Sequence, residues 1–242
     1  IEPRRMRDRA ADLLAEEAWA DLWRADGGGM IKLSDYVLGA SCYKSRLMAA
    51  LVGVKMDHEA VDFHPGRAHK SLEFAQLNPA GTLPVMVDGD MILTESTAML
   101  VYLAKRAGPQ WLGPDDAKSA AQVQQWLAFS GRLAASLGMA RLHDMLLYQG
   151  DIDAWRKDGH AALRELEAAL TERRFAGGEW LVGDTPSIAD IACFPNVALS
   201  QDGGVSLDAY PSVRLWTRRI RALDRFIEMP GIHRLHELSP AP

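Results

Sequence analysis

The stretch from Asn78 to Ser96 holds the residues whose types and spacing are best suited to bind a small molecule. Pro84 begins an apolar run typical of a strand, although a proline cannot donate to a strand ladder and so leaves backbone groups open. Glu95 and Ser96 follow at the start of a helical run, where a carboxylate, a hydroxyl and free backbone N–H groups come together. This combination indicates a receptor for an extended, peptide-like ligand with an amino-acid end.

The elements that must position this stretch follow a β-α-β pattern. Apolar spacing and turn residues predict each of them. In chain order they are a strand over 31–37, a turn over 39–42, a helix over 43–54, a strand over 58–63, and two strands joined at Asp88-Gly89 before a helix that ends near Gly108. This order, over residues 30–108, is typical of a small thioredoxin-like α/β domain.

The second half of the chain has a different character, because strand patterns disappear after residue 114. Helical runs are expected at about 116–140, 151–175, 187–199 and 212–226. Residues 115–242 are therefore expected to form an all-α domain. Ser187 and Asp190 have the spacing of a capping box, which favours a structural role for both.

Residues 1–29 form a separate segment that ends in three glycines. Its central part has helical spacing, and its acidic residues are atypical of an organellar transit peptide. Two interpretations stay open. The segment is either an amphipathic helical extension that docks on the rest of the protein, or a non-native stretch translated upstream of a natural start at Met30.

Composition excludes several classes of function. The net charge is -5 and the isoelectric point about 5.8, so no broad basic surface favours nucleic acid or an anionic membrane. No apolar run approaches the roughly 20 residues that span a bilayer. Cys42 and Cys193 are the only cysteines, which rules out a disulfide scaffold and suits a reducing cytosol. A cytoplasmic location is the expectation.

The run Asn78-Pro79-Ala80-Gly81-Thr82-Leu83-Pro84-Val85, followed by Thr94-Glu95-Ser96 in this two-part layout, resembles the cytosolic glutathione transferases. The resemblance covers about residues 31–230 and is nearest to the bacterial beta-, theta- and zeta-like groups. It implies the glutathione transferase fold, which is an α/β thioredoxin-like N-terminal domain plus an all-α C-terminal domain, here with the N-terminal extension. It also implies glutathione as co-substrate, no metal, and a homodimer.

The resemblance assigns roles in glutathione binding to individual residues. Pro84 is expected in the cis form, so that the Leu83 backbone pairs with the cysteinyl part of glutathione. Glu95 and Ser96 would hold the γ-glutamyl end, although taken alone they could simply cap a helix. His69 and Lys70 match positions that contact the glycyl carboxylate in relatives, and the nearby Arg67 could also reach it.

Catalysis is expected at the turn between the first strand and the first helix, where the thiol of glutathione must be ionised. Ser41, at the expected N-cap, is one candidate to stabilise the thiolate. Cys42, as a former of a mixed disulfide, and Tyr36, near the end of the first strand, are the others, beside a mechanism that uses backbone groups alone. Gly39 stands where theta-, tau- and zeta-like relatives carry the catalytic serine, and this departure keeps the alternatives open.

The predicted function is a detoxifying glutathione transferase that conjugates glutathione to a small hydrophobic electrophile. The electrophile is expected to meet the loop around Val37-Leu38 and the first long helix of the second half. Two alternatives remain: a glutathione-dependent disulfide reductase or peroxidase, and a non-catalytic binding protein of the same fold.

Overall fold

The computed structural model describes residues 30–229 of the 242-residue chain, so the predicted extension at 1–29 lies outside the described residues. Two compact units account for the described part. The first comprises residues 30–36 and 55–95, and the second comprises residues 37–54 and 96–229. The domain limits expected from the sequence, 30–108 and 115–242, stay predictions.

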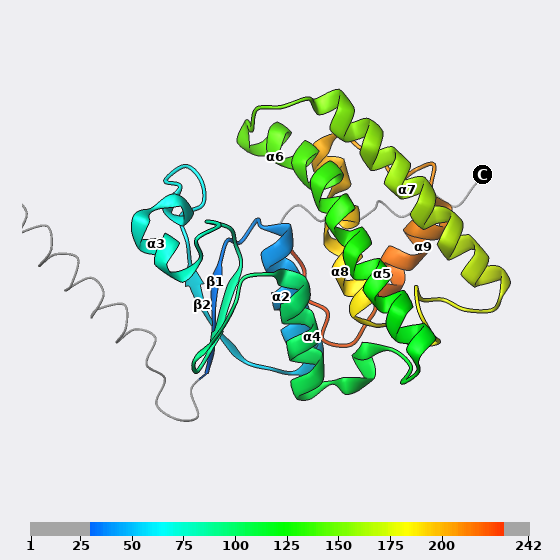
Figure 1. Cartoon of the computed structure of the whole chain (residues 1–242). Helices are drawn as coiled ribbons and strands as arrows, with labels where there is room; N and C mark the ends of the chain where they lie inside the picture. Colours follow the sequence, from blue (N-terminus) through cyan, green and yellow to red (C-terminus); the bar gives the residue numbers. More distant parts are fainter. Residues whose placement is uncertain (1–29, 230–242) are drawn as a thin grey trace, which may run out of the picture. The chain divides into compact units, whose positions relative to one another are not determined.

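The first unit is built on a four-stranded mixed sheet with the order β2-β1-β3-β4. β1 pairs in parallel with β2 and antiparallel with β3, and β4 pairs antiparallel with β3 (Figure 1). Gly89 has a φ of 62° in the turn between β3 and β4, as expected from the Asp88-Gly89 signal. The strands are β1 (Ile31–Asp35), β2 (Met56–Ala60), β3 (Val85–Asp88) and β4 (Met91–Leu93).

β2 differs most from its expectation, because it begins and ends earlier than the predicted 58–63. It lies at the edge of the sheet, and four of its five residues are exposed. An edge strand that buries no face has no apolar alternation to mark its limits. Its register is instead set by backbone pairing with the buried central strand, in which Leu33 lies opposite His58.

The connection from β2 to β3 contains η1 (Ala68–Lys70) and α3 (Leu72–Leu77). Ser71 caps α3, since its hydroxyl accepts a hydrogen bond of 3.0 Å from the Phe74 amide. Phe74 then packs with Val85 and Val87 of β3 in a small core. This core fixes the connection against the sheet of the first unit.

The second unit consists of helices. α2 packs against α4, and both pack against α8, which also contacts α5 and α9 (Figure 1). α8 is buried along nearly its whole length, as expected for a helix in which all residues except Asp190 and Asn196 are apolar. The helices are α2 (Ala40–Val52), α4 (Ser96–Ala107), η2 (Pro109–Leu112), α5 (Ala117–Leu133), α6 (Met139–Leu146), α7 (Ile152–Phe175), α8 (Ile188–Ala198), η4 (Ser200–Gly203) and α9 (Pro211–Arg221).

The long helix expected over 116–140 is interrupted. α5 ends at Leu133 and passes through a π-helical segment, Ala134–Gly138, before α6 begins. Each residue of an α-helix adds about 100° of rotation, so the wider π turn changes the face that every later residue presents. Side-chain directions in α6 therefore do not follow from the periodicity of α5.

The start of α2 also corrects an expectation. Ser41 was expected at the N-cap, but Gly39 holds that place, and Ser41 is the second residue of the helix. Gly39 has the extended backbone of an N-cap, and its carbonyl accepts the first helical hydrogen bond, 2.9 Å from the Tyr43 amide. Since glycine has no side chain, no side chain at the N-cap satisfies the first amides of α2.

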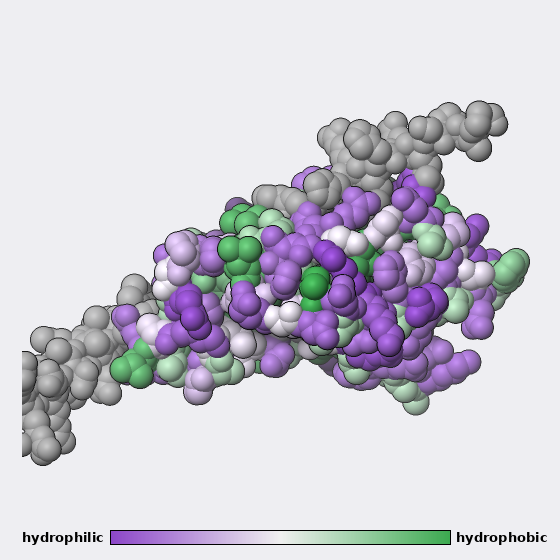
Figure 2. Space-filling model, turned by 90° about the horizontal axis from the view of Figure 1, so that it is seen from above, coloured by the Kyte–Doolittle hydropathy of each residue, from purple (hydrophilic) through white to green (hydrophobic). Residues whose placement is uncertain are grey.

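The surface carries no broad apolar field on the face drawn in Figure 2, where hydrophilic residues predominate and hydrophobic ones form small separate groups. None of the helices in the described part of the chain is long and apolar enough to cross a membrane.

Candidate functional site

The loop that leads into β3 is organised by Asn78, whose buried side chain makes three hydrogen bonds. Its Nδ2 donates to the carbonyl and the hydroxyl oxygen of Thr82, at 2.8 and 2.9 Å, and its Oδ1 accepts from the Ala80 amide at 3.1 Å. These bonds fold the chain back on itself just before Leu83. Asn78 was quoted in the sequence motif but not assigned to the site, and the structure identifies it as the residue that shapes the loop.

At Gly81 this loop packs closely against His69 and Lys70, the residues expected at the glycyl end of glutathione. It has a φ of 56°, and a Cβ added there would lie 2.7 Å from the carbonyl oxygen of His69. The Nζ of Lys70 donates across the same contact to the carbonyl of Ala80, at 3.2 Å. The motif and the pair His69-Lys70 are therefore brought together within the first unit.

His69 and Lys70 are placed very differently. The Lys70 side chain is exposed, whereas His69 is only 2% exposed and stacks on Phe63 with ring centroids 4.2 Å apart. Burial lowers the pKa of the His69 imidazole below its ordinary value, and the positive charges of Lys70 and Arg67 lower it further. The Nδ1 of His69 is buried without a hydrogen-bond partner among the described residues.

Tyr36 belongs to the same aromatic stack. Its ring lies 5.0 Å from that of Phe63, on the chain just after β1. The order Tyr36, Phe63, His69 thus links the end of the first strand to the loop before the motif. The structure brings together two predicted site residues here through Phe63, which sequence reasoning did not single out.

Leu83 and Pro84 enter β3 as the sequence motif predicts. The peptide bond between them is cis, which confirms the expectation. Leu83 is half-buried against the core formed by Phe74, Val85 and Val87, and Pro84 is buried. The first strand residue is Val85, so the proline stands just outside the ladder, where its missing N–H breaks no strand pairing.

Glu95 and Ser96 lie where β4 passes into α4. Glu95 is exposed in the short connection, and Ser96 is the first residue of the helix and 9% exposed. A carboxylate therefore stands directly before a helix N-terminus, whose amides and dipole favour an anion.

Ser41 and Cys42 lie in the first turn of α2. Ser41 is half-buried, and Cys42 is 1% exposed. The predicted residues therefore divide between the units: Tyr36, His69, Lys70, Leu83, Pro84 and Glu95 belong to the first, and Ser41, Cys42 and Ser96 to the second. Their assembly around one ligand stays a proposal.

One buried arginine was missed altogether. Arg141 of α6 is 6% exposed, and its Nη1 donates to the carbonyl of Leu38, at 2.7 Å, just before α2. Nothing in the sequence marks it, because the π-helical segment before α6 hides which way the residue faces.

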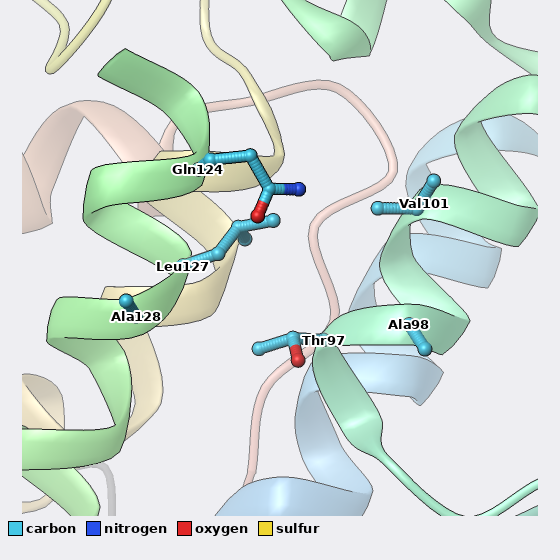
Figure 3. Close-up of a pocket in the computed structure, with 6 residues that line it drawn as sticks. All are labelled: Thr97, Ala98, Val101, Gln124, Leu127 and Ala128. Carbon is cyan, nitrogen blue, oxygen red and sulfur yellow. The ribbon is translucent and has the colours of Figure 1, made fainter. Parts of the chain in front are cut away.

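A cavity of about 460 Å³ lies within the second unit, between α4 and α5. Figure 3 shows Thr97 and Val101 of α4 turned toward Gln124 and Leu127 of α5. Ala98 and Ala128 complete the lining. The lining is therefore mixed, with four apolar side chains beside the polar Thr97 and Gln124.

The comparisons with known proteins agree with this architecture. The family model described as "Glutathione S-transferase, N-terminal domain" matches residues 31–105, and "Glutathione S-transferase, C-terminal domain" matches residues 149–219. The chain is 31% identical to Glutathione S-transferase 2 of Anopheles gambiae over 181 residues, which cover 73% of this chain and 83% of that protein.

Solved structures show the same fold. A glutathione S-transferase from Pseudomonas fluorescens is 27% identical, with a TM-score of 0.75, and the match covers 83% of this chain and 99% of that one. Ure2p in complex with S-hexylglutathione is 25% identical, with a TM-score of 0.71 and coverage of 81% and 96%. The mixed-sheet thioredoxin-like domain, the helical C-terminal domain and these matches together show that this chain belongs to the glutathione S-transferase family.

Proposed function

We propose that the chain is a glutathione transferase that binds glutathione, ionises its thiol and transfers the thiolate to a small hydrophobic electrophile. The observation that carries the proposal is the pair Glu95-Ser96 at the start of α4, directly after the β3–β4 hairpin. An ammonium and a carboxylate on one carbon suit an exposed carboxylate beside a helix N-terminus. S-hexylglutathione bound to a relative of the same fold supports the ligand class.

Each part of glutathione has a proposed partner. Ser96 and the first amides of α4 receive the γ-glutamyl carboxylate, and Glu95 receives the ammonium. The Leu83 backbone pairs with the cysteinyl unit. For the glycyl carboxylate, the exposed Lys70 is the better candidate, and Arg67 is a second exposed cation close to it in sequence. The buried His69 acts by supporting the Gly81 loop.

Thiol ionisation is assigned to the start of α2. Lowering a thiol pKa by about 2 units takes about 2.7 kcal/mol of preference for the anion. A hydroxyl bonded to a charged group contributes about 1.5–3 kcal/mol, and a helix N-terminus up to about 2 kcal/mol. The half-buried Ser41 hydroxyl and the first-turn amides of α2 are therefore sufficient together, without the serine that Gly39 replaces.

The other interpretations are less well supported. A disulfide reductase needs an accessible thiol, and Cys42 is only 1% exposed. Tyr36 is less well placed than Ser41 to stabilise a thiolate, because its ring is stacked on Phe63. A binding protein without catalysis would keep the glutathione contacts and lack thiol ionisation. We further propose a homodimer and a cytoplasmic location, as is typical of the family, and leave the beta-, theta- or zeta-like grouping as a prediction.

Calorimetry with glutathione, combined with the ultraviolet absorbance of the bound thiolate, tests the proposal. We expect binding, an ionised thiol near neutral pH, and conjugation of chloro-dinitrobenzene. Ser41→Ala should lower the rate of conjugation about 10-fold or more while glutathione still binds, and Cys42→Ala should leave the rate nearly unchanged. Absence of binding would overturn the function. Binding without ionisation would favour the non-catalytic alternative, and loss of turnover only in Cys42→Ala would favour the redox one.

A further inference from the structure

The turn before α2 is held from outside by Arg141. Its Nη1 donates to the Leu38 carbonyl at 2.7 Å, and its Nε donates to Oδ2 of Asp202 at 3.0 Å. The side chains of Arg141 and Asp202 are 7% and 8% exposed. A guanidinium can bridge two acceptors in this way because its donors form a rigid fork, which a lysine ammonium does not have.

Leu38 directly precedes Gly39, the N-cap of the helix that is proposed to stabilise the thiolate. Glycine is the least restricted residue at such a position, and it offers no side-chain bond to the first turn. The neighbouring carbonyl of Val37 is bonded by Nη2 of Arg46 at 2.8 Å, from α2 itself. The carbonyls of Val37 and Leu38 are thus each bonded by an arginine. Arg46 is close to the turn along the chain, and Arg141 is 103 residues away from Leu38.

The acidic partner of Arg141 is itself fixed. Asp202 lies in η4, which packs against α6. A Cβ on Gly203 would lie only 2.7 Å from the backbone nitrogen of Arg141, so η4 and α6 approach each other as closely as glycine permits. The carboxylate that orients the guanidinium therefore has little freedom to move.

We propose that Arg141 is a positioning residue for glutathione activation: it holds the Leu38 carbonyl and thereby fixes the first turn of α2, with Ser41 and its neighbouring amides, against the sulfur. The inference rests on the proposed function, because it assigns to this turn the task of stabilising the thiolate. It also accounts for the ordered start of α2 without a side-chain cap at Gly39. The conformational restraint that glycine lacks comes from α6.

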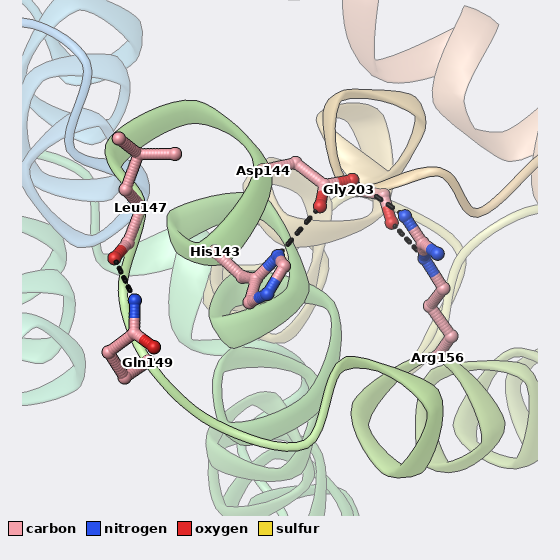
Figure 4. A network of polar contacts seen from close by, with 6 residues as sticks. All are labelled: His143, Asp144, Leu147, Gln149, Arg156 and Gly203. Atoms are coloured by element: carbon pink, nitrogen blue, oxygen red, sulfur yellow. Dashed lines mark hydrogen bonds and ion pairs between the residues drawn. The ribbon is translucent and has the colours of Figure 1, made fainter.

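Arg156 supplies a matched control. It extends from α7 to the same region, where its Nε donates to the Gly203 carbonyl at 2.9 Å and its Nη2 to Oδ2 of Asp144 at 2.7 Å (Figure 4). It therefore secures η4 and α6 as Arg141 does, but the bonds that define its place do not include Leu38. Arg141→Lys and Arg156→Lys both keep a positive charge and remove a fork, and only the first loses the bond to the turn.

The first measurement needs no glutathione. Exchange of the Tyr43 amide, which bonds to the Gly39 carbonyl, reports the first turn of α2. Exchange of the Ile191 amide, which bonds to the carbonyl of the N-cap Ser187, reports the equivalent first turn of α8. In Arg141→Lys we expect Tyr43 exchange to accelerate about 10-fold relative to Ile191, the size of a charge-assisted hydrogen bond. Arg156→Lys should leave that ratio unchanged. Equal effects in both variants would overturn the inference.

The second measurement concerns the bound thiol. In Arg141→Lys the pH at which glutathione ionises on the protein should rise by about one unit, a 10-fold loss of thiolate preference, and Arg156→Lys should match the wild type. If the wild type binds no glutathione, the proposed function fails, whatever the exchange data show. If the wild type ionises the thiol and Arg141→Lys does so at the same pH, only the positioning role fails.

A third variant separates positioning from the loss of an ion pair. Arg141→Met combined with Asp202→Leu removes both buried charges together, so neither is left unpaired, and such replacements are often tolerated. The bond to Leu38 is lost in this variant as well. We expect it to reproduce the Tyr43 exchange and the thiol shift of Arg141→Lys. A folded double variant with wild-type values in both would overturn the inference.

Discussion

The indole Nε1 of Trp216 donates a hydrogen bond of 2.8 Å to the carboxylate of Asp190, joining α9 to the start of α8. The same carboxylate accepts bonds from the amides of Leu181 and Ser187, at 3.1 and 2.9 Å, and from the Ser187 hydroxyl at 3.2 Å. Asp190 is fully buried, and this burial raises the pKa of its carboxyl group. The capping box expected from the sequence is confirmed. It is part of a larger hydrogen-bond network around Asp190 that joins the start of α8 to Leu181 and to α9.

Removing this carboxylate should destabilise the protein strongly. In Asp190→Ala the donors of Trp216, Leu181 and Ser187 remain buried without an acceptor, and each such group costs about 1–3 kcal/mol. We expect the free energy of unfolding in urea to fall by at least about 3 kcal/mol. Asp151→Ala is the control, because it removes the exposed N-cap of α7 and should cost only about 1 kcal/mol. Similar losses in the two variants would show that the hydrogen-bond network around Asp190 adds no stability beyond helix capping.

Gly81→Ala should damage the site through the contact with His69. Both Gly81 and Gly89 have positive φ, so an alanine at either position costs about 1 kcal/mol of backbone strain. Only at Gly81 does the new Cβ meet backbone, at 2.7 Å from the His69 carbonyl, while nothing lies within 4 Å of a Cβ at Gly89. We expect Gly81→Ala to weaken glutathione binding about 10-fold or more and Gly89→Ala to leave it unchanged, as measured by calorimetry. Parallel losses in both variants would trace the effect to backbone strain alone.

The buried histidine should make stability depend on pH. Because the pKa of His69 is lower in the folded protein than its ordinary value of about 6.5, the unfolded chain takes up a proton that the folded chain resists. The contribution of neutral His69 to stability is therefore complete above about pH 6.5 and declines as the pH falls through that value, until the folded group also titrates.

His69→Gln isolates this contribution. The difference in unfolding free energy between wild type and His69→Gln should shrink as the pH is lowered from about 7.5 to about 5, since glutamine does not titrate. Urea unfolding across that range measures it. His64→Gln, which removes an exposed histidine from the same connection between β2 and β3, is the control. A difference that is constant with pH would mean that burial of His69 carries no proton linkage.

Where local signals dominate, the sequence predicted the elements closely. The helix expected at about 151–175 is Ile152–Phe175, because the carboxylate of Asp151 caps it and a long amphipathic run sustains it. The hairpin at Asp88-Gly89 and the helix beginning at Ser96 were anticipated for similar reasons. In each case the deciding residues are neighbours on the chain.

The errors arose where distant contacts decide. Ser41 is a better N-cap residue than Gly39 by preference, yet the helix begins two residues earlier than that preference implies. Hydrogen bonds from Arg46 and Arg141 to the carbonyls of Val37 and Leu38 hold the turn before this helix, and these bonds cannot be read from the sequence. Arg141 itself was missed because the π-helical segment Ala134–Gly138 shifts the phase of α6, a change that no residue in the segment announces.

The proposed homodimer predicts an effect at the cavity between α4 and α5. The family resemblance implies a dimer contact between the thioredoxin-like domain of one subunit and the helical domain of the other. α4 lies almost entirely within the N-terminal family model, and α5 lies in the helical half of the chain. Val101→Glu would place a carboxylate in this mostly apolar cavity. If a second subunit covers the cavity, burying that charge without a cationic partner costs several kcal/mol. We expect light scattering to give a dimer for the wild type and a monomer for Val101→Glu.

Gln125→Glu adds the same charge to exposed α5 surface outside the cavity lining and should remain dimeric. A dimer that survives Val101→Glu would move the contact elsewhere, and a monomeric wild type would overturn the assembly.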